Sequence, residues 1–124
     1  MKHKTKDIQY CERLFQSFYE IGSTPQGGVT RLGYTETEDA MHEVFKGLGR
    51  ELDGSIHTDE VANTYVANTD EMGYTLIGSH LDSVIDGGRY DGVAGVIAGL
   101  MVMKWAKEDG LRIPLRVGAF RCEE

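Results

Sequence analysis

The chain has 124 residues, about the size of one domain, and 40% of them are apolar, which is enough to form a hydrophobic core. It carries 20 acidic against 13 basic residues, a formal net charge of −7. This charge argues against nucleic acid and against an anionic membrane as partners, because both are themselves negatively charged.

A first helix is predicted near the amino terminus, followed by a loop. Residues 7–21 place apolar side chains at helical spacing, namely Ile8, Cys11, Leu14, Phe15, Phe18 and Ile21. Residues 22–28 then interrupt the pattern with glycine and proline. The basic start of the chain lacks an apolar segment of signal-peptide length, and the longest apolar run, 93–103, is far shorter than a membrane span. We therefore expect a soluble, cytoplasmic protein.

A second helix is predicted to begin after Thr35, which forms a T-x-x-E capping box with Glu38. Gly49 is a candidate C-cap for this helix. Its apolar residues recur at i, i+3, i+4 and i+7, and they are Met41, Val44, Phe45 and Leu48.

The second half of the chain predicts strands and one further helix. Strands are expected at 55–61, 64–68 and 74–79, with a turn at NTDEMG between the last two. The segment YTLIGSH is too apolar for a strand with one face in water, so we expect it at the centre of the sheet. A helix over 91–107 and a strand over 113–120 follow. This strand–helix–strand order predicts a parallel pair, and hence a layered α/β fold with a mixed, partly parallel sheet flanked by helices.

Polar side chains follow two of the predicted strands, at the point where each strand ends. The first strand leads into His80 and Asp82, and the second leads into Glu123 and Glu124. In parallel α/β sheets, ligands bind at the carboxyl ends of the strands. If the two strands are neighbours, these side chains converge on one edge of the sheet together with Asp91.

These residue types suit divalent metal chemistry, since imidazole and carboxylates are good ligands for ions such as zinc or manganese. Residues i and i+2 point the same way on an extended chain, so Asp82 can accept a hydrogen bond from the far nitrogen of His80 and fix its tautomer. Asp91 opens the predicted helix, where its two oxygens could bridge two ions. Glu123 and Glu124 would repel if both were buried without a metal. With a metal, one carboxylate binds it and the other serves as general base.

Several of these residues also have purely structural interpretations. His80 and Asp82 could form a hydrogen-bonded pair without a metal, and Asp91 could be a helix N-cap. Arg31 could hold substrate or a loop carboxylate, and we favour the structural role. Cys122 could be a nucleophile, although no histidine lies close to it in sequence.

The remaining sequence patterns do not indicate a functional site. Gly95 and Gly99 have G-x-x-x-G spacing, which favours close helix–sheet packing over a membrane dimer in so short a segment. Asn63 is predicted to be a turn residue. Cys11 and Cys122 form no framework and are expected to be free thiols in a reducing compartment. The sequence contains no P-loop, no G-x-S-x-G, no G-x-G-x-x-G and no EF-hand spacing.

Three segments, GGVTRLGYT, GSHLDSVIDGGRYDGVAGVIAGL and VGAFRCEE, together resemble the M20-type metal-dependent hydrolases. The resemblance is strongest for the branch that contains N-carbamoyl-L-amino-acid hydrolases, allantoate amidohydrolases and β-ureidopropionases. It runs in order from about residue 7 to the last residue. The resemblance implies hydrolysis of the C–N bond of an N-carbamoyl amino acid or a ureido acid such as allantoate, with release of ammonia, carbon dioxide and the amine.

The resemblance also implies a role for each residue of the predicted site. Two divalent metal ions, zinc or manganese, would be bound, with His80 on one ion, Glu124 on the other and Asp91 bridging them. Glu123 would be the general base that deprotonates the attacking water, and Asp82 would orient His80. The glycines that would let the loop bring Asp91 close to the ions are Gly87, Gly88 and Gly92.

Members of this family are much longer chains, so residues 1–124 are expected to be the N-terminal part of a catalytic domain, truncated after the Glu pair. The family's other histidine ligands, a dimerisation domain and most substrate-binding residues come later, and His3, His42 and His57 do not match them. We expect a homodimer acting on a small-molecule substrate when the protein is intact, and little activity from these residues alone. The alternatives are an M20-type peptidase or aminoacylase, or a non-catalytic fragment that self-associates through exposed sheet edges.

Overall fold

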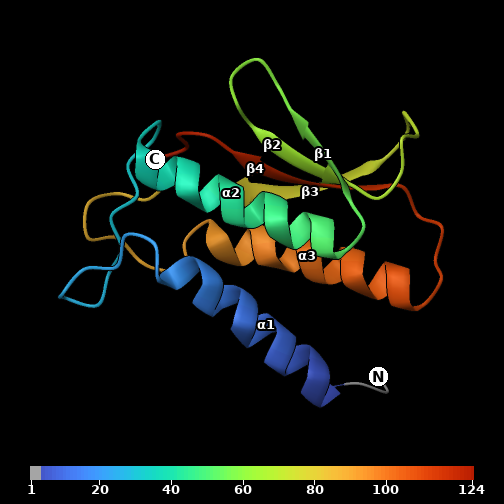
Figure 1. Ribbon diagram of the computed structural model, residues 1–124, viewed down its shortest axis with the longest axis horizontal. Coiled ribbons are helices and arrows are strands. Elements are labelled where there is room, and N and C mark those ends of the chain that lie inside the picture. Colours follow the sequence, from blue (N-terminus) through green and yellow to red (C-terminus); the bar gives the residue numbers. More distant parts are fainter. Residues whose placement is uncertain (1–3) are drawn as a thin grey trace.

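The computed structural model describes residues 4–124, and within this range the chain forms three helices and one four-stranded sheet (Figure 1). In chain order the elements are α1 (Lys4–Tyr19), α2 (Glu36–Glu51), β1 (Ser55–Thr58), β2 (Thr64–Ala67), β3 (Thr75–His80), α3 (Val93–Glu108) and β4 (Leu115–Phe120). Over these residues, none of the helices has both the length and the apolar character that crossing a membrane requires.

The sheet is mixed, with strand order β1-β2-β4-β3. β1 pairs with β2, and β2 with β4, in antiparallel fashion, whereas β3 and β4 run parallel. The parallel register aligns Thr75 with Leu115 and His80 with Phe120, so the two strands end at the same level. The predicted α/β fold and its β3–α3–β4 crossover are therefore confirmed.

The prediction that the segment YTLIGSH lies at the centre of the sheet is wrong, because β3 is an edge strand. Leu76 points to the uncovered face of the sheet and is 46% exposed. Ile77 and Ser79 lie against α3, close to Gly99 and Gly95. The sequence shows that this strand is apolar, but strand order depends on contacts with distant segments, and β2 and β4 are the strands that pair on both sides.

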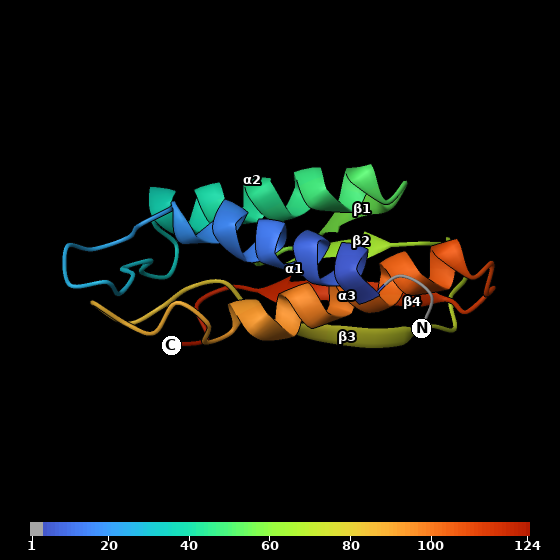
Figure 2. The same cartoon turned by 90° about the horizontal axis from the view of Figure 1, so that it is seen from below.

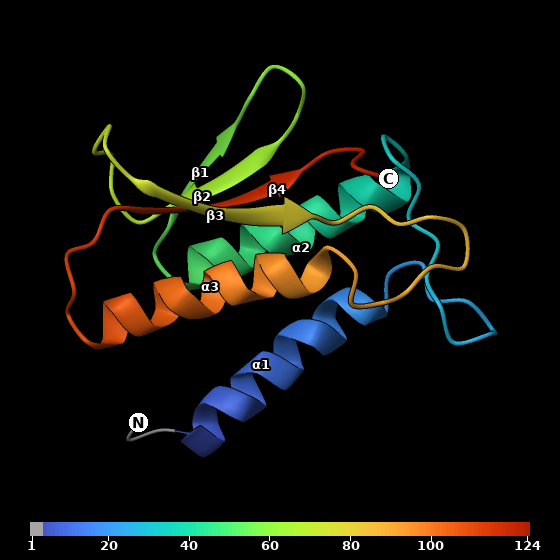
Figure 3. The ribbon, with the colours of Figure 1, turned by 180° about the vertical axis from the view of Figure 1, so that it is seen from behind.

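All three helices lie on one side of the sheet, and α1 is the outermost (Figures 2 and 3). α2 packs on β1 and β2, α3 packs on β3 and β4, and α1 packs on α2 and α3. Leu14 and Phe18 of α1 are fully buried, whereas Ile8, part of the predicted apolar face, is half exposed. The core therefore lies between the sheet and this helical layer. Its largest buried apolar side chains include Leu14, Phe18, Met41, Phe45, Ile97, Leu100 and Met103.

The start of α2 confirms one half of the predicted capping box. Thr35 is the N-cap, and its hydroxyl accepts a hydrogen bond from the Glu38 amide at 3.5 Å. The Glu38 side chain does not return to Thr35, because its oxygens accept hydrogen bonds from other donors, including the Cys122 amide. The predicted C-cap is also wrong: α2 continues past Gly49 to Glu51, and Leu52 is the C-cap.

Close packing explains three glycines of the two inner helices, Gly49, Gly95 and Gly99. An ideal Cβ at Gly99 would lie 2.7 Å from Val117 Cγ1, and one at Gly95 would lie 2.7 Å from Ser79 Cβ. An ideal Cβ at Gly49 would lie 2.8 Å from Val66 Cγ1. Both inner helices therefore approach the sheet more closely than a side chain at these positions would allow, as the G-x-x-x-G spacing of α3 predicts.

Two glycines of α2 provide a matched test of this packing. Gly47→Ala should raise the free energy of unfolding by about 0.5–1 kcal/mol, because an added Cβ meets nothing within 4 Å and alanine favours the helix. Gly49→Ala should lower it by about 1–3 kcal/mol, because the new methyl group overlaps the buried Val66 side chain. Urea unfolding followed by circular dichroism measures both changes. Equal effects of the two substitutions would contradict this packing.

Candidate metal site

His80 is the last residue of β3 and is 7% exposed. Its Nδ1 lies 3.1 Å from the Asp82 carbonyl oxygen and 3.2 Å from Asp82 Oδ1. The H-x-D pair predicted from the sequence is thus present. Because Asp82 engages Nδ1, the other ring nitrogen, Nε2, is left to face Glu123 Oε2 at 3.4 Å and Asp91 Oδ1 at 3.8 Å. This is the arrangement of a histidine oriented to bind a metal through Nε2.

The Glu pair follows β4 and is held by the same aspartate. The amides of Glu123 and Glu124 donate to Asp82 Oδ1 at 3.1 Å and to Asp82 Oδ2 at 2.9 Å. The Asp82 side chain is almost fully buried, so its negative charge is stabilised largely by these donors and by the His80 ring. Asp82 therefore fixes both the imidazole and the backbone of the Glu pair, and the second of these functions was not predicted.

Asp91 lies just before α3, outside the helix. Gly92 is the N-cap residue and has a positive φ of 71°, so the N-cap interpretation of Asp91 is wrong. An ideal Cβ at Gly92 would lie 2.6 Å from His80 Nδ1, whereas one at Gly88 would meet nothing within 4 Å. Of these two glycines of the loop, Gly92 is the one that close approach to His80 requires.

Among residues 4–124, His80, Asp91 and Glu124 form a group in which one ligand atom from each residue lies within 4.8 Å of the others. The two carboxylates are exposed and the imidazole is buried. The hydrogen bond with Asp91, followed by partial desolvation and repulsion from Asp91, raises the pKa of the Glu124 carboxyl. One imidazole and two carboxylates at this spacing are a donor set that fits a divalent cation.

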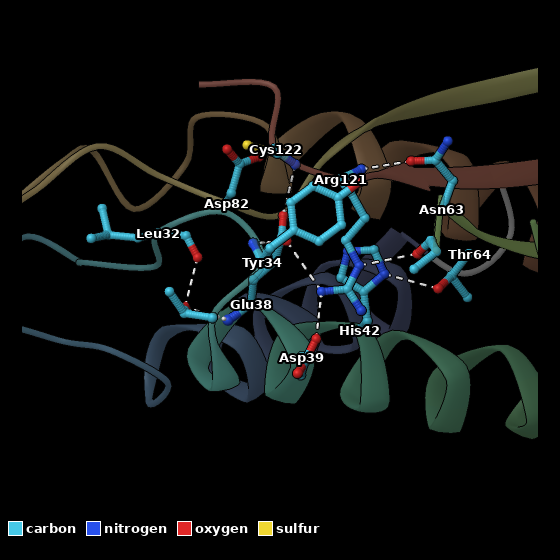
Figure 4. A network of polar contacts seen from close by, with 12 residues as sticks. Leu32, Tyr34, Glu38, Asp39, His42, Asn63, Thr64, Asp82, Arg121 and Cys122 are labelled. Atoms are coloured by element: carbon cyan, nitrogen blue, oxygen red, sulfur yellow. Dashed lines mark hydrogen bonds and ion pairs between the residues drawn. The ribbon is translucent and has the colours of Figure 1, made fainter. Parts of the chain in front are cut away.

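A second buried carboxylate, Glu38 of α2, also holds the end of β4 (Figure 4). Glu38 Oε2 accepts from the Cys122 amide at 3.0 Å. Glu38 Oε1 accepts from the Tyr34 amide at 2.8 Å and from Arg121 Nη1 at 3.1 Å. Sequence analysis missed this role. Its position in the sequence could have indicated this role, because Glu38 precedes Met41 by three residues and therefore lies on the apolar face of α2.

Arg121 connects this carboxylate to two other parts of the chain. Its Nη1 donates to Asp39 Oδ1 at 2.6 Å, its Nε donates to the Ala62 carbonyl at 3.0 Å, and its amide donates to Asn63 Oδ1 at 2.7 Å. Burial alone would lower the pKa of the guanidinium, but the hydrogen bonds to Asp39 and Glu38 outweigh it and raise the pKa. Asn63 lies in the loop between β1 and β2, directly after the turn at 59–62, and its own amide donates to Asp59 Oδ1.

Arg31 has the structural role that we favoured. The side chain is nearly fully buried, with Nη2 donating to the Phe18 carbonyl at 2.7 Å and Nε donating to the Ile21 carbonyl at 2.9 Å. The hydrogen-bond partners of its guanidinium within residues 4–124 are these two carbonyls at the end of α1. They do not include a loop carboxylate. Burial lowers the pKa of Arg31 to about 10.

The other histidines and the cysteines lie outside the metal-ligand group. His42 is buried in α2, with Nδ1 2.8 Å from Thr64 Oγ1, and His57 is exposed on β1. His3 lies outside the described residues. Cys11 and Cys122 are free thiols, as predicted.

Comparison with known proteins confirms the resemblance given by the sequence motifs. The N-carbamoyl-L-amino acid amidohydrolase of Geobacillus stearothermophilus is 36% identical over 121 residues, which cover 91% of this chain and 30% of that protein. The allantoate amidohydrolase of Bacillus subtilis is 36% identical over 112 residues, covering 85% of this chain and 25% of the relative. No family model matches the chain.

The fold gives the same result. The crystal structure of a hydantoinase/carbamoylase family amidase from Burkholderia ambifaria superposes with a TM-score of 0.86 at 33% identity, covering 94% of this chain and 30% of that one. The chain therefore matches the N-terminal part of the hydantoinase/carbamoylase branch of M20-type amidohydrolases. It spans 25–30% of the length of these relatives.

Gly92→Ala tests the close approach of the Asp91 loop to His80. The substitution should lower the free energy of unfolding by about 1–3 kcal/mol, because it places a side chain at positive φ and against the imidazole. The nuclear magnetic resonance signals of the His80 ring should shift as well. Gly88→Ala, in the same loop but with open space around it, is the control and should leave both unchanged. An undisturbed His80 ring in Gly92→Ala would refute the contact.

His42 should make the fold sensitive to acid. Burial, followed by repulsion from Arg121, lowers its pKa from 6.5 to about 4. Between these two values the unfolded chain binds a proton that the folded chain does not, so stability falls as the pH drops from 6.5 towards 4. The total loss from this group is about 3 kcal/mol.

Urea unfolding at several pH values would measure this dependence, and His42→Asn should flatten it in the same interval. Substituting the exposed His57 by asparagine should leave the dependence unchanged. A pH profile that is the same in His42→Asn as in the unmodified chain would show that His42 is not the group responsible.

Proposed function

We propose that this chain is the N-terminal part of a metal-dependent amidohydrolase that cleaves the C–N bond of N-carbamoyl amino acids or of ureido acids such as allantoate. The observation that carries the proposal is the group of His80, Asp91 and Glu124, with a further carboxylate, Glu123, beside the imidazole. The names of the relatives from Geobacillus stearothermophilus and Bacillus subtilis support the ureido substrate class.

In this proposal, His80, Glu124 and Asp91 would hold two divalent ions, zinc or manganese, with His80 as a ligand of one, Glu124 as a ligand of the other and Asp91 shared by both. When bound, the ions would supply Lewis-acid polarisation of the ureido carbonyl and of the attacking water. Asp82 would keep a proton on His80 Nδ1 and leave Nε2 free as the ligand atom, a role supported by the short distances between the two side chains.

Glu123 is proposed as the general base. Its backbone is fixed by Asp82 while its carboxylate remains more than half exposed, so it can reach a water molecule near the ligand group. It would take the proton from the water that attacks the carbamoyl carbon and pass it to the leaving nitrogen. Its backbone amide would continue to donate to Asp82 throughout.

Activity is proposed for the longer protein that the relatives represent, as a homodimer acting on a small molecule. Residues 1–124 would form the N-terminal part of its catalytic domain. Because the chain covers about 30% of those relatives, we expect residues 1–124 alone to bind metal but to hydrolyse little or no substrate.

A second candidate is a non-catalytic chain that self-associates. The edge position of β3 and the exposed Leu76 favour this second candidate. A measurement of metal binding distinguishes the two candidates, because only the amidohydrolase requires it.

Metal titration tests the proposal. Calorimetric titration with Zn²⁺ and Mn²⁺ should give a defined affinity, and His80→Ala should weaken it at least tenfold because a ligand is removed. His57→Ala, an exposed histidine on β1, is the matched control and should bind as the unmodified chain does. In the longer protein, Glu123→Gln should bind metal but release almost no ammonia from N-carbamoyl amino acids. Equal affinities for His80→Ala and His57→Ala would refute the site.

A further inference from the structure

We infer that Glu38, in the first turn of α2, is a positioning residue for the Glu pair of the metal site. This inference rests on the proposed function, since it assigns Glu38 a role in presenting the carboxylates that would bind metal and accept the proton. Glu38 would act on the Glu pair indirectly, through the backbone. Its contact with this segment is the Cys122 amide, directly before Glu123.

Two buried carboxylates bind three consecutive amides at the end of the chain described here. Glu38 accepts from the amide of Cys122, and Asp82 accepts from the amides of Glu123 and Glu124. Glu38 is fully buried and Asp82 is 2% exposed. The segment that carries the Glu pair is therefore bound on one side by α2 and on the other by the segment after β3. This double attachment restricts the backbone before any ligand is present.

The conformation of Cys122 shows that this segment is constrained. Cys122 has a φ of +51°, in the left-handed region that non-glycine residues seldom occupy. An ideal Cβ at Gly33 would lie 2.8 Å from the Cys122 Cβ, so the chain before α2 leaves no room for the segment to move towards it. Such a conformation persists only where surrounding contacts hold it, and the bond from the Cys122 amide to Glu38 is one of them.

Arg121 explains why the fold tolerates a buried charge at Glu38. An unpaired buried carboxylate is strongly unfavourable, whereas one that is paired and hydrogen-bonded is not. Glu38 meets the Arg121 guanidinium at 3.1 Å, and Arg121 is itself attached to Asp39 and to the Ala62 carbonyl. The pair thus joins α2 to the residue that precedes Cys122.

Within residues 4–124, every group that hydrogen-bonds to the Glu38 carboxylate is a donor, and this property suggests the substitution that tests the inference. Its two oxygens accept from Tyr34, Arg121 and Cys122. Glu38→Gln keeps the shape of the side chain but turns one oxygen into an NH₂ group, which must face a donor. The positioning role predicts that amide hydrogen exchange at Glu123 and Glu124 rises at least tenfold in this variant, although neither amide contacts Glu38.

The same variant should weaken Co²⁺ binding about tenfold and change the absorption spectrum of the bound ion, because the ligand carboxylates lose their fixed position. Glu43→Gln, on the exposed side of α2 where Glu43 pairs with Lys46, is the matched control and should change neither readout. Leu48→Ala separates positioning from general stability. It removes a buried side chain of the same helix, so it should lower stability while Co²⁺ affinity stays within about twofold.

The outcomes are distinct. Unchanged exchange at Glu123 and Glu124 in a folded Glu38→Gln variant overturns the inference, as does a loss of Co²⁺ affinity in Leu48→Ala equal to that in Glu38→Gln. Failure of the unmodified chain to bind Co²⁺ overturns the proposed function instead, while the exchange measurement still decides whether Glu38 positions the segment. If Glu38→Gln does not fold, Arg121→Lys keeps the cation but loses the fork of donors, and the same exchange increase is expected.

Discussion

The candidate site depends on one buried carboxylate, that of Asp82. It lies 3.2 Å from His80 Nδ1 and accepts the amides of Glu123 and Glu124, so it joins the ends of the two parallel strands. A carboxylate removed from water loses several kcal/mol of solvation, and donors placed around it must offset this loss. The requirement to satisfy Asp82 therefore brings the imidazole and the Glu pair together, with or without a cation.

The loops around Asp82 are held by contacts between distant segments. The residue after Asp82, Ser83, exchanges hydrogen bonds with Arg31: its amide donates to the Arg31 carbonyl, and its hydroxyl accepts from the Arg31 amide. Val29 and Gly87 exchange two backbone hydrogen bonds a few residues further on. The guanidinium of Arg31 reaches in the opposite direction to the end of α1. Helices that contribute no ligand thus hold the loop that does.

Much of the fold could be predicted because its signals are local. Helical spacing, a Thr35 cap and β-branched segments each depend on neighbouring residues, and all seven elements are present near their predicted positions. Two of the errors concern relations between elements. β3 was expected at the centre of the sheet and lies at its edge, and Gly49 was expected to end α2 but packs against Val66. Neither could be read from local pattern, because strand order and helix–sheet distance are set by segments far away in sequence.

The sequence by itself determined which residues could form the site. His80 and Asp82 are two residues apart on an extended chain, and the Glu pair follows a strand, so residue type and spacing were sufficient. Only the tertiary structure decided that Asp82 also binds the amides of the Glu pair and that a buried glutamate of α2, Glu38, binds the Cys122 amide. Those hydrogen bonds join residues more than 40 positions apart, and their partners are backbone amides, which every residue type except proline supplies. Such contacts leave no pattern in the sequence until the fold brings the two segments together.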